Sequence, residues 1–302
     1  MINIGMIGSD LIHTFGYAMH FNRANLNAVD QHEALPLWQA KLIKDNPDVQ
    51  LIADAKLTHI AGEPADVKAA MADVFDMEVA LSTDEVIEAC DLIMVMDENV
   101  DSRTALAEQS LNAGRTTFID KIPDRAGDLV DLAKQKGVRL GAWSQVGHHT
   151  EFDAIRNMPT GGTAFLTYQF SQDITSIYAI HLICAMQAAL PGRVTTFQQL
   201  VKGDQQIVMI ENDQGTRAVL AVGEHYVPGI AHVDYSMGEQ YLIADGRDRC
   251  GAFSRSAQDV VNLKLNHDCR FTEQHIIEAA KLIDLFSKDV VDRGSIDLQT
   301  YG

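Results

Sequence analysis

Short apolar runs alternate with helix-like stretches through the first half of the sequence. Residues three to four positions apart are apolar in the stretches between the runs, as is typical of helices, whereas continuous apolar runs are typical of strands buried on both faces. The runs cover residues 2–7, 57–61, 79–81, 91–96, 116–119 and 138–142, and the helical stretches cover 11–21, 37–44, 66–74, 84–89, 101–112 and 124–136. This alternation predicts an α/β domain built on a Rossmann-type, doubly wound parallel sheet.

Three residues mark the expected ends of these helices. Thr83 stands at the start of one helical stretch and is expected to be its N-cap. Gly114 and Gly137 follow two others and are expected to be their C-caps, because glycine readily adopts the left-handed backbone conformation found there.

The pattern changes near residue 146. Extended candidates then dominate, interrupted by helical stretches at 176–190 and 272–291, with a turn signal at 212–215. The extended candidates are residues 163–170, 194–198, 206–211, 217–222, 232–236 and 241–244. We therefore expect two domains. Residues 1–145 form the dinucleotide-binding domain, and 146–302 form an α+β domain for substrate binding and oligomerisation, with an open, mainly antiparallel sheet.

Composition limits the partners. The chain has 302 residues, of which 46% are hydrophobic and 22% charged, which suffices for two cores. Its formal net charge is −18. An acidic chain repels phosphate backbones, so no nucleic-acid partner is expected, and solubility is the simplest role for the charge.

The cysteines and the apolar runs indicate a cytoplasmic protein. The four cysteines are far apart and form no C-x-x-C pair, which argues against a disulfide framework or a zinc ribbon. The opening MINIGMIG reads as a strand rather than a signal peptide. The longest apolar run, residues 177–190, is too short to span a membrane and contains His181, so no membrane partner is expected.

The first strand-to-helix turn is a candidate phosphate site. A full G-x-G-x-x-G fingerprint is absent, since only Gly8 lies in the turn. Gly8 and Ser9 would let a pyrophosphate approach the backbone at a helix N-terminus, provided that the carboxylate of Asp10 points away. The alternative is a tight turn that binds no nucleotide.

Glu63 follows the second strand, where an acidic residue would bind the adenosine ribose. No arginine stands beside it to bind a 2′-phosphate, so NAD is favoured over NADP. The alternative for Glu63 is a solvated residue at the start of a helix.

Within residues 82–140, STDEVIEACDLIMVMD leads through ALAEQSLNAGRTTFIDK to GVRL. This stretch most clearly resembles the glucose-fructose oxidoreductase / inositol dehydrogenase (Gfo/Idh/MocA) family. Asp120-Lys121 matches the first two positions of the family's (E/D)-K-P motif, and Ile180-His181-Leu182 matches its helical histidine. Residues 271–288 resemble its final helix, so the resemblance covers essentially the whole length.

The resemblance implies hydride transfer between a nicotinamide cofactor and a hydroxyl carbon of a sugar, cyclitol or related polyol. It assigns His181 as the general base and Lys121 as the cation near substrate and nicotinamide, which suits a reaction that develops an oxyanion as a proton leaves. Without this chemistry, Lys121 would be a surface lysine after a strand, and His181 a core histidine. The expected cofactor contacts are Gly8, Ser9, Asp10, Glu63, Asp97, Asn99, Asp120 and Lys121.

Departures from the family pattern motivate other hypotheses. Ile122 replaces the motif proline, and Ile177 stands where the family often has an aspartate. Tyr178, three residues before His181, lies on the same helical face and could supply a hydroxyl to catalysis. The turn Asp97-Glu98-Asn99 places carboxylates near the expected cofactor. A non-catalytic member that binds a sugar or nucleotide is therefore the second hypothesis, and a lyase or hydrolase that uses nicotinamide transiently is the third.

The segment after the run at 138–142 is expected to contact substrate. Gln145 and His148 could bond sugar hydroxyls. A metal site of His148, His149 and His181 is not expected, because adjacent histidines usually point apart. His13 could face the ligand or the surface of its helix, and 266–268 read as turn residues. An uncovered antiparallel sheet needs protection, so a homo-oligomer, dimer or tetramer, is expected, as the family resemblance also implies.

Overall fold

The computed structural model describes residues 1–8, 11–62, 64–156, 163–169, 179–190, 192–202, 205–223, 230–235, 238–243, 248–287 and 296–297. Two compact units make up the chain. Unit 1 contains residues 1–142 and 253–276, and unit 2 contains 143–252 and 277–302. The first break lies close to the boundary expected after residue 145, whereas 253–276 group with unit 1.

The sheet of unit 1 has six strands in the order β3-β2-β1-β4-β5-β6. The neighbours from β3 to β5 pair in parallel. The order reverses beside β1, as in a doubly wound sheet, so the predicted Rossmann-type architecture is confirmed. The strands are β1 (Ile2–Ile7), β2 (Ala55–Ala61), β3 (Glu78–Val79), β4 (Leu92–Val95), β5 (Thr116–Asp120) and β6 (Leu140–Trp143).

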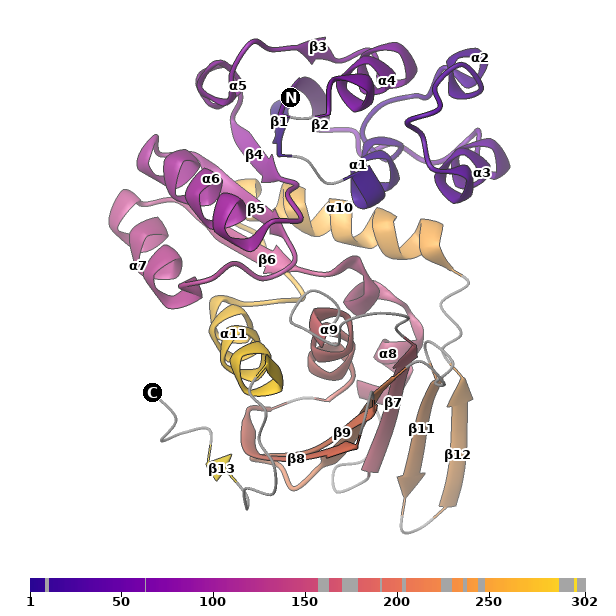
Figure 1. Cartoon of the computed structure of the whole chain (residues 1–302), viewed down its shortest axis with the longest axis vertical. Helices are drawn as coiled ribbons and strands as arrows, with labels where there is room; N and C mark the ends of the chain where they lie inside the picture. The colour runs from indigo at the N-terminus through magenta and orange to yellow at the C-terminus, as the bar shows by residue number, and fades with distance from the viewer. Residues whose placement is uncertain are drawn as a thin grey trace. The chain divides into compact units, whose positions relative to one another are not determined.

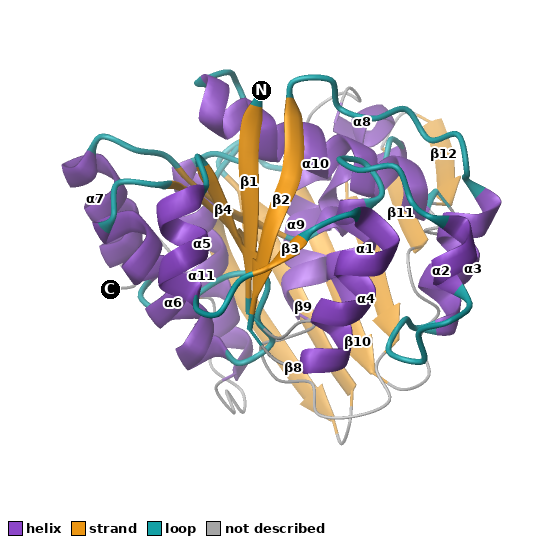
Figure 2. Ribbon diagram, turned by 90° about the horizontal axis from the view of Figure 1, so that it is seen from above, coloured by secondary structure: helices purple, strands orange, loops and turns teal. Residues whose placement is uncertain are grey.

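Helices cover both faces of this sheet. Figure 2 shows α1 and α4 on one side of β1 and β2, and α5 and α6 on the other. Because β4 is buried along its whole length, its sequence reads as a continuous apolar run. The helices are α1 (Leu11–Ala18), α2 (Leu26–Val29), α3 (Leu37–Asp45), α4 (Ala65–Phe75), α5 (Thr83–Ala89), α6 (Val100–Asn112) and α7 (Ala126–Lys136).

The helix ends correct two predictions. Ser82, not Thr83, is the N-cap of α5, because the Ser82 hydroxyl accepts a hydrogen bond from the backbone N–H of Glu85. The Glu85 side chain in turn accepts from the backbone N–H of Leu81 at 2.8 Å. Gly137 is the C-cap of α7 in the left-handed conformation, as predicted. Ala113, not the predicted Gly114, is the C-cap of α6, and Gly114 follows it in the left-handed conformation.

Helix α10 (Arg249–Leu265) was not predicted from the sequence. From Phe253 onward it belongs to unit 1, where the Phe253 ring lies 5.2 Å from that of Tyr17 and the Ser256 hydroxyl lies 2.8 Å from the Tyr17 hydroxyl. Its buried positions recur three to four residues apart, the ordinary signal of a helix packed on one face. They are Ala252, Phe253, Ser256, Ala257, Val260, Val261 and Leu263.

Unit 2 is built on a seven-stranded sheet in the order β12-β11-β7-β10-β9-β8-β13. Only β7 and β10 pair in parallel among the pairings of the described strands, so the expected mainly antiparallel sheet is confirmed. The strands are β7 (Thr163–Gln169), β8 (Val194–Lys202), β9 (Gln205–Asn212), β10 (Arg217–Gly223), β11 (Ile230–Tyr235), β12 (Gly238–Ile243) and β13 (Ile296–Asp297).

The long helices of unit 2 lie on one face of this sheet (Figure 1). They are α9 (Ala179–Ala189) and the later part of α11 (Glu273–Ser287), and the shorter elements are η1 (Gln145–His148) and α8 (Glu151–Arg156). Every residue of α9 is buried. Phe286 of α11 packs its ring 5.6 Å from that of Phe197 on β8. In the described part of the chain, no helix is long and apolar enough to cross a membrane.

Candidate functional site

The carboxyl ends of β1, β2 and β4 meet at two glycines. Gly8 has a φ of +123°, and a Cβ there would lie 2.1 Å from the carbonyl oxygen of Met96. Gly62 has a φ of +124°, and its Cβ would lie 2.0 Å from the carbonyl oxygen of Gly8. Both the conformation and the spacing therefore require glycine. The predicted contacts Ser9, Asp10 and Glu63 lie outside the described residues.

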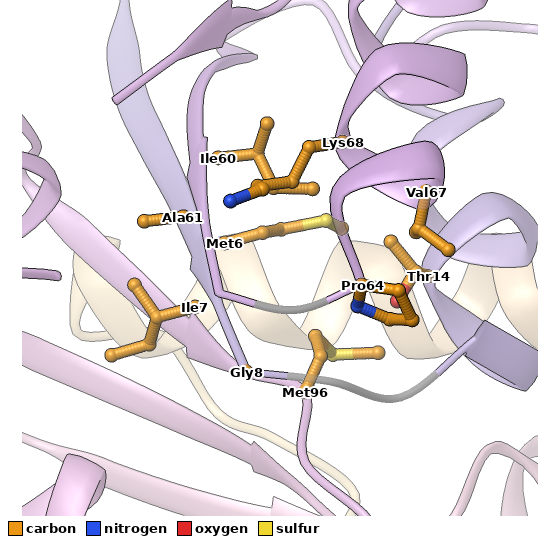
Figure 3. Close-up of a pocket in the computed structure, with 10 residues that line it drawn as sticks. All are labelled: Met6, Ile7, Gly8, Thr14, Ile60, Ala61, Pro64, Val67, Lys68 and Met96. Carbon is orange, nitrogen blue, oxygen red and sulfur yellow. The ribbon is translucent and has the colours of Figure 1, made fainter. Parts of the chain in front are cut away.

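A small hollow lies beside this turn (Figure 3). Its walls are mostly apolar, and the Lys68 side chain of α4 extends along it. The hollow holds about 10 Å³, room for one water molecule, so a larger ligand would occupy its mouth or move a lining side chain. The lining residues are Met6, Ile7, Gly8, Thr14, Ile60, Ala61, Pro64, Val67, Lys68 and Met96.

The side chains of the acidic turn after β4 cap the N-terminus of α6. The Asp97 side chain is buried, and its two oxygens accept hydrogen bonds from the backbone N–H of Asn99 and the hydroxyl of Ser102, both at 2.9 Å. The Asn99 side chain accepts from the backbone N–H of Ser102 and is the N-cap of α6. Asp97 and Asn99 thus stabilise the start of a helix, and their contact with a cofactor stays a prediction.

Arg103 joins the ends of β4 and β5, and sequence reasoning missed it. Its guanidinium is buried and donates to three backbone carbonyls: Asp97 at 2.8 Å, Glu98 at 3.0 Å and Ile122 at 2.8 Å. A cation held by carbonyl oxygens fixes both loops at once. No signal in the sequence marks it, because an arginine within a polar helix is normally solvated.

Asp120, at the end of β5, is paired with His13. The carboxylate is fully buried, and one oxygen lies 2.5 Å from His13 Nδ1, while its other oxygen has no hydrogen-bond partner among the described residues. The His13 ring also packs edge-on against Phe253 at 5.8 Å. The side chain of His13 is therefore directed inward, and the pair ties α1, which follows the glycine turn, to the end of β5.

Lys121 has an unusual backbone. Its φ is +74°, a left-handed conformation that costs a lysine about 1–2 kcal/mol. The other non-glycine residues with positive φ in the described ranges, Asp76, Arg125 and Asn266, are all exposed, whereas Lys121 is only 4% exposed. A buried cation held in a strained conformation at a strand end is a feature that often marks a functional site.

His181 lies in the first turn of α9 in unit 2 and is 5% exposed. Its Nδ1 lies 2.6 Å from the hydroxyl oxygen of Ser144, a residue that sequence reasoning did not select. Gln145 follows, and its side-chain oxygen lies 3.1 Å from the same hydroxyl. Thus Gln145 and His181, both predicted site residues, meet at Ser144. Tyr178 lies outside the described residues.

The remaining histidines of this segment have packed surroundings. His148 is buried with its ring 5.7 Å from that of Trp143. The His149 ring packs against Phe152, and its Nδ1 lies 3.9 Å from a carboxylate oxygen of Glu151. Within the described ranges, no cluster of three or more His, Cys, Asp or Glu residues could hold a metal ion. A substrate contact by His148 stays a prediction.

Comparisons with known proteins identify the fold. No protein-family model matches the sequence, and no curated protein matches it. Solved structures do match. A candidate myo-inositol dehydrogenase from Sinorhizobium meliloti 1021 is 14% identical with a TM-score of 0.72, covering 99% of this chain and 100% of the other. An oxidoreductase from Agrobacterium radiobacter, in complex with NAD⁺, L-tartaric acid and magnesium, is 12% identical with a TM-score of 0.70, covering 99% and 98%.

A third match is the UDP-N-acetylglucosamine 3-dehydrogenase GnnA from Acidithiobacillus ferrooxidans, which is 13% identical with a TM-score of 0.64 and covers 94% of this chain and 96% of the other. At such low identity the likeness shows the fold. The fold implied by the resemblance to the Gfo/Idh/MocA family is therefore confirmed, and the chain has the fold of these dehydrogenases over nearly its whole length.

Proposed function

We propose that the protein is an NAD(P)-dependent oxidoreductase that transfers a hydride between a nicotinamide cofactor and a hydroxyl carbon of a sugar, cyclitol or related polyol. The observation that carries the proposal is Lys121, a buried cation in a strained conformation at the end of a strand of a doubly wound sheet. Support comes from similar solved structures, one holding NAD⁺ and others named as a myo-inositol and a UDP-sugar dehydrogenase.

The residues of unit 1 fit the cofactor. Gly8 and Gly62 leave the backbone bare at the strand ends where doubly wound sheets bind dinucleotides. When bound, the nicotinamide supplies the hydride acceptor. NAD rather than NADP is our proposal, based on Glu63 in the sequence. Lys68, in the hollow beside the turn, is the residue that would favour a 2′-phosphate instead, so both nucleotides must be compared.

The chain's own residues would handle charge and proton. The His181 imidazole accepts the hydroxyl proton as the carbon–hydrogen bond breaks, because a histidine can be neutral near pH 7. The Lys121 ammonium stabilises the negative charge that develops on the substrate oxygen. Arg103 and the His13–Asp120 pair hold the loops and the strand end beside Lys121 in place. Gln145 and His148 are proposed to contact substrate.

A nucleotide titration followed by a substrate screen tests the proposal. Tryptophan or nicotinamide fluorescence measures NADH and NADPH binding, and nicotinamide absorbance then reports turnover with sugars, cyclitols and polyols. Lys121→Met and His181→Gln should each abolish turnover. The matched controls Lys136→Met and His267→Gln change exposed residues and should keep it. Near wild-type rates in either site variant would contradict that residue's role.

A second candidate function is binding of a small molecule without redox turnover. The departures from the family pattern favour it, since Ile122 replaces the motif proline and Ile177 stands where the family often has an aspartate. Tight NADH binding with turnover would exclude this candidate. Failure of both nucleotides to bind, in protein whose circular dichroism shows a folded state, would favour it.

We also propose a homo-oligomer, dimer or tetramer, formed through the sheet of unit 2. Leu200 and Met209, on the neighbouring strands β8 and β9, are 65% and 50% exposed. Apolar side chains exposed on a sheet face are typical of an interface. Met209→Lys should lower the sedimentation coefficient, whereas Leu81→Lys, at a residue of unit 1 that is 98% exposed, should not. A monomeric wild type would contradict the proposal.

A further inference from the structure

We propose that Ser144 is a positioning residue that, with Gln145, holds His181 as the tautomer protonated on Nδ1, so that Nε2 carries the lone pair that accepts a proton. The inference rests on the proposed function for its catalytic consequence, whereas the tautomer itself is a property of unit 2 that can be measured separately.

The contact is short and buried. Ser144 directly follows β6 and has no exposed surface, and its hydroxyl oxygen lies 2.6 Å from His181 Nδ1. The backbone N–H of Ser144 also donates to the sulfur of Cys184 at 3.3 Å, three residues further along α9. Backbone and side chain of Ser144 therefore bond the same helix at two points less than one turn apart, which fixes the hydroxyl beside the ring.

The number of hydrogen bonds that a hydroxyl can make determines the tautomer. A serine hydroxyl has one proton to donate and two lone pairs to accept with. The backbone N–H of Val146 donates to the Ser144 oxygen at 3.2 Å, which uses one lone pair. The Ser144 hydroxyl donates its proton to the Gln145 side-chain oxygen at 3.1 Å. The remaining lone pair can only accept, so the Nδ1 atom of His181 must carry a proton.

The tautomer matters because a neutral imidazole has one nitrogen that donates and one that accepts. With Nδ1 protonated, Nε2 is the basic atom, and its position is set by the Ser144 bond. A base in the wrong tautomer cannot take the proton, and general-base catalysis contributes roughly 10²–10⁴-fold to a rate. If the chain oxidises alcohols, loss of Ser144 should lower kcat by about 10²-fold or more and change KM little.

Long-range proton–nitrogen correlation spectra of the full chain, with ¹⁵N-labelled histidine, test the tautomer directly. The two ring nitrogens of a neutral histidine have well-separated shifts that identify the protonated one. The His181→Gln variant assigns the signals of His181 among the 11 histidines. We expect protonated Nδ1 in the wild type and in Ser144→Thr, which retains the hydroxyl.

Two variants should change the spectrum, and one should not. Ser144→Ala removes the acceptor and should mix the two tautomers. Gln145→Leu leaves Ser144 in place but frees its proton to donate to Nδ1, so the proton should move to Nε2. Gln145 is half-buried in a short helical turn, and this variant tests the idea even if Ser144→Ala fails to fold. The control Ser110→Ala removes a buried serine of unit 1 that bonds Thr117, and it should leave the His181 spectrum unchanged.

The outcomes separate the two proposals. A wild-type His181 protonated on Nε2, or an unchanged tautomer in Gln145→Leu, would overturn the inference whatever the enzyme does. A protonated Nδ1 in a chain that turns over no alcohol would support the positioning and contradict the proposed function. In an active enzyme, Ser144→Thr should restore kcat that Ser144→Ala loses, and a lack of rescue would overturn the catalytic consequence.

Discussion

His20 is a buried histidine whose neutral form the fold requires. It follows α1 in unit 1 with no exposed surface, and within the described chain neither ring nitrogen has a hydrogen-bond partner. Its backbone carbonyl accepts from the N–H of Ile52 at 2.9 Å, so the residue is held by its main chain. Burial lowers its pKa from 6.5 to about 4, because the charged ring loses its hydration.

The size of the effect follows from this shift in pKa. One pKa unit corresponds to about 1.4 kcal/mol, so the lowering corresponds to about 3 kcal/mol in the free energy of unfolding. The folded-state pKa is below the unfolded-state value. The protein therefore has this part of its free energy of unfolding in full above pH 6.5 and loses it as the pH falls to about 4. Between pH 7 and pH 5 the loss should be about 2 kcal/mol.

Replacement of His20 by leucine should remove this pH dependence. Leucine has a similar volume and no charge, so we expect His20→Leu to be at least as stable as the wild type at pH 7 and more stable by about 2 kcal/mol at pH 5. Urea unfolding at several pH values measures this. The chain has two tryptophans, so Trp143→Phe leaves Trp38 as the only one. Because Trp38 lies in unit 1, its fluorescence then reports the unfolding of that unit.

The exposed His267 provides the control, since His267→Gln should leave the pH dependence of the free energy of unfolding as it is in the wild type. If His20→Leu loses stability as steeply as the wild type between pH 7 and pH 5, then protonation of His20 is not what opposes folding in acid. The reasoning from burial would then be refuted.

Three further changes test the site and its supports. Gly8→Ala should lower the free energy of unfolding by about 2 kcal/mol or more and abolish NADH binding. Gly127→Ala should do neither, because an added Cβ there has no heavy atom within 4 Å. Denaturant unfolding and fluorescence titration measure the two effects. Arg103→Met should lower the free energy of unfolding by about 3 kcal/mol, because it leaves three carbonyls unpaired. Urea unfolding that gives the same free energy for variant and wild type would contradict this. Burial raises the pKa of Glu278 above 4.5, so stability is lost as the pH rises above 4.5 and the buried carboxyl ionises. Glu278→Gln should remove this loss, and Glu278→Ala should lower the free energy of unfolding by about 1–3 kcal/mol because Val194 and Gln187 lose their acceptor.

Much of the fold was predictable because burial leaves a direct mark on sequence. Strands covered on both faces are rich in apolar residues, so a run such as that of β4 is continuous and easily read. Helix α10 was missed although Phe253, Val260 and Val261 carry the helical spacing. Its alternating small and polar residues hide the stripe, although Asp248, which accepts a hydrogen bond from the backbone N–H of Gly251, is a helix-start signal in the sequence.

Two residues of the proposed site could be selected from the sequence, and their roles stay predictions. Lys121 was selected from its strand-end position and His181 from a motif, and both are buried. Their supports are not visible in the sequence, because they depend on contacts across long separations. Asp120 meets His13 across 107 residues, and Ser144 meets His181 across 37. Neither pairing has a local signature.

The acidic turn after β4 shows why local reading misjudges charge. In the sequence, Asp97 and Glu98 place two negative charges beside the expected cofactor. In the folded chain Asp97 accepts two hydrogen bonds at the start of α6, where the helix dipole favours an anion, and Glu98 is exposed. The buried Arg103 adds a positive charge against the same turn. The local electrostatic objection to a bound dinucleotide is therefore weaker than the residue types alone suggest, because the carboxylate that the turn buries is already compensated by its own helix and arginine.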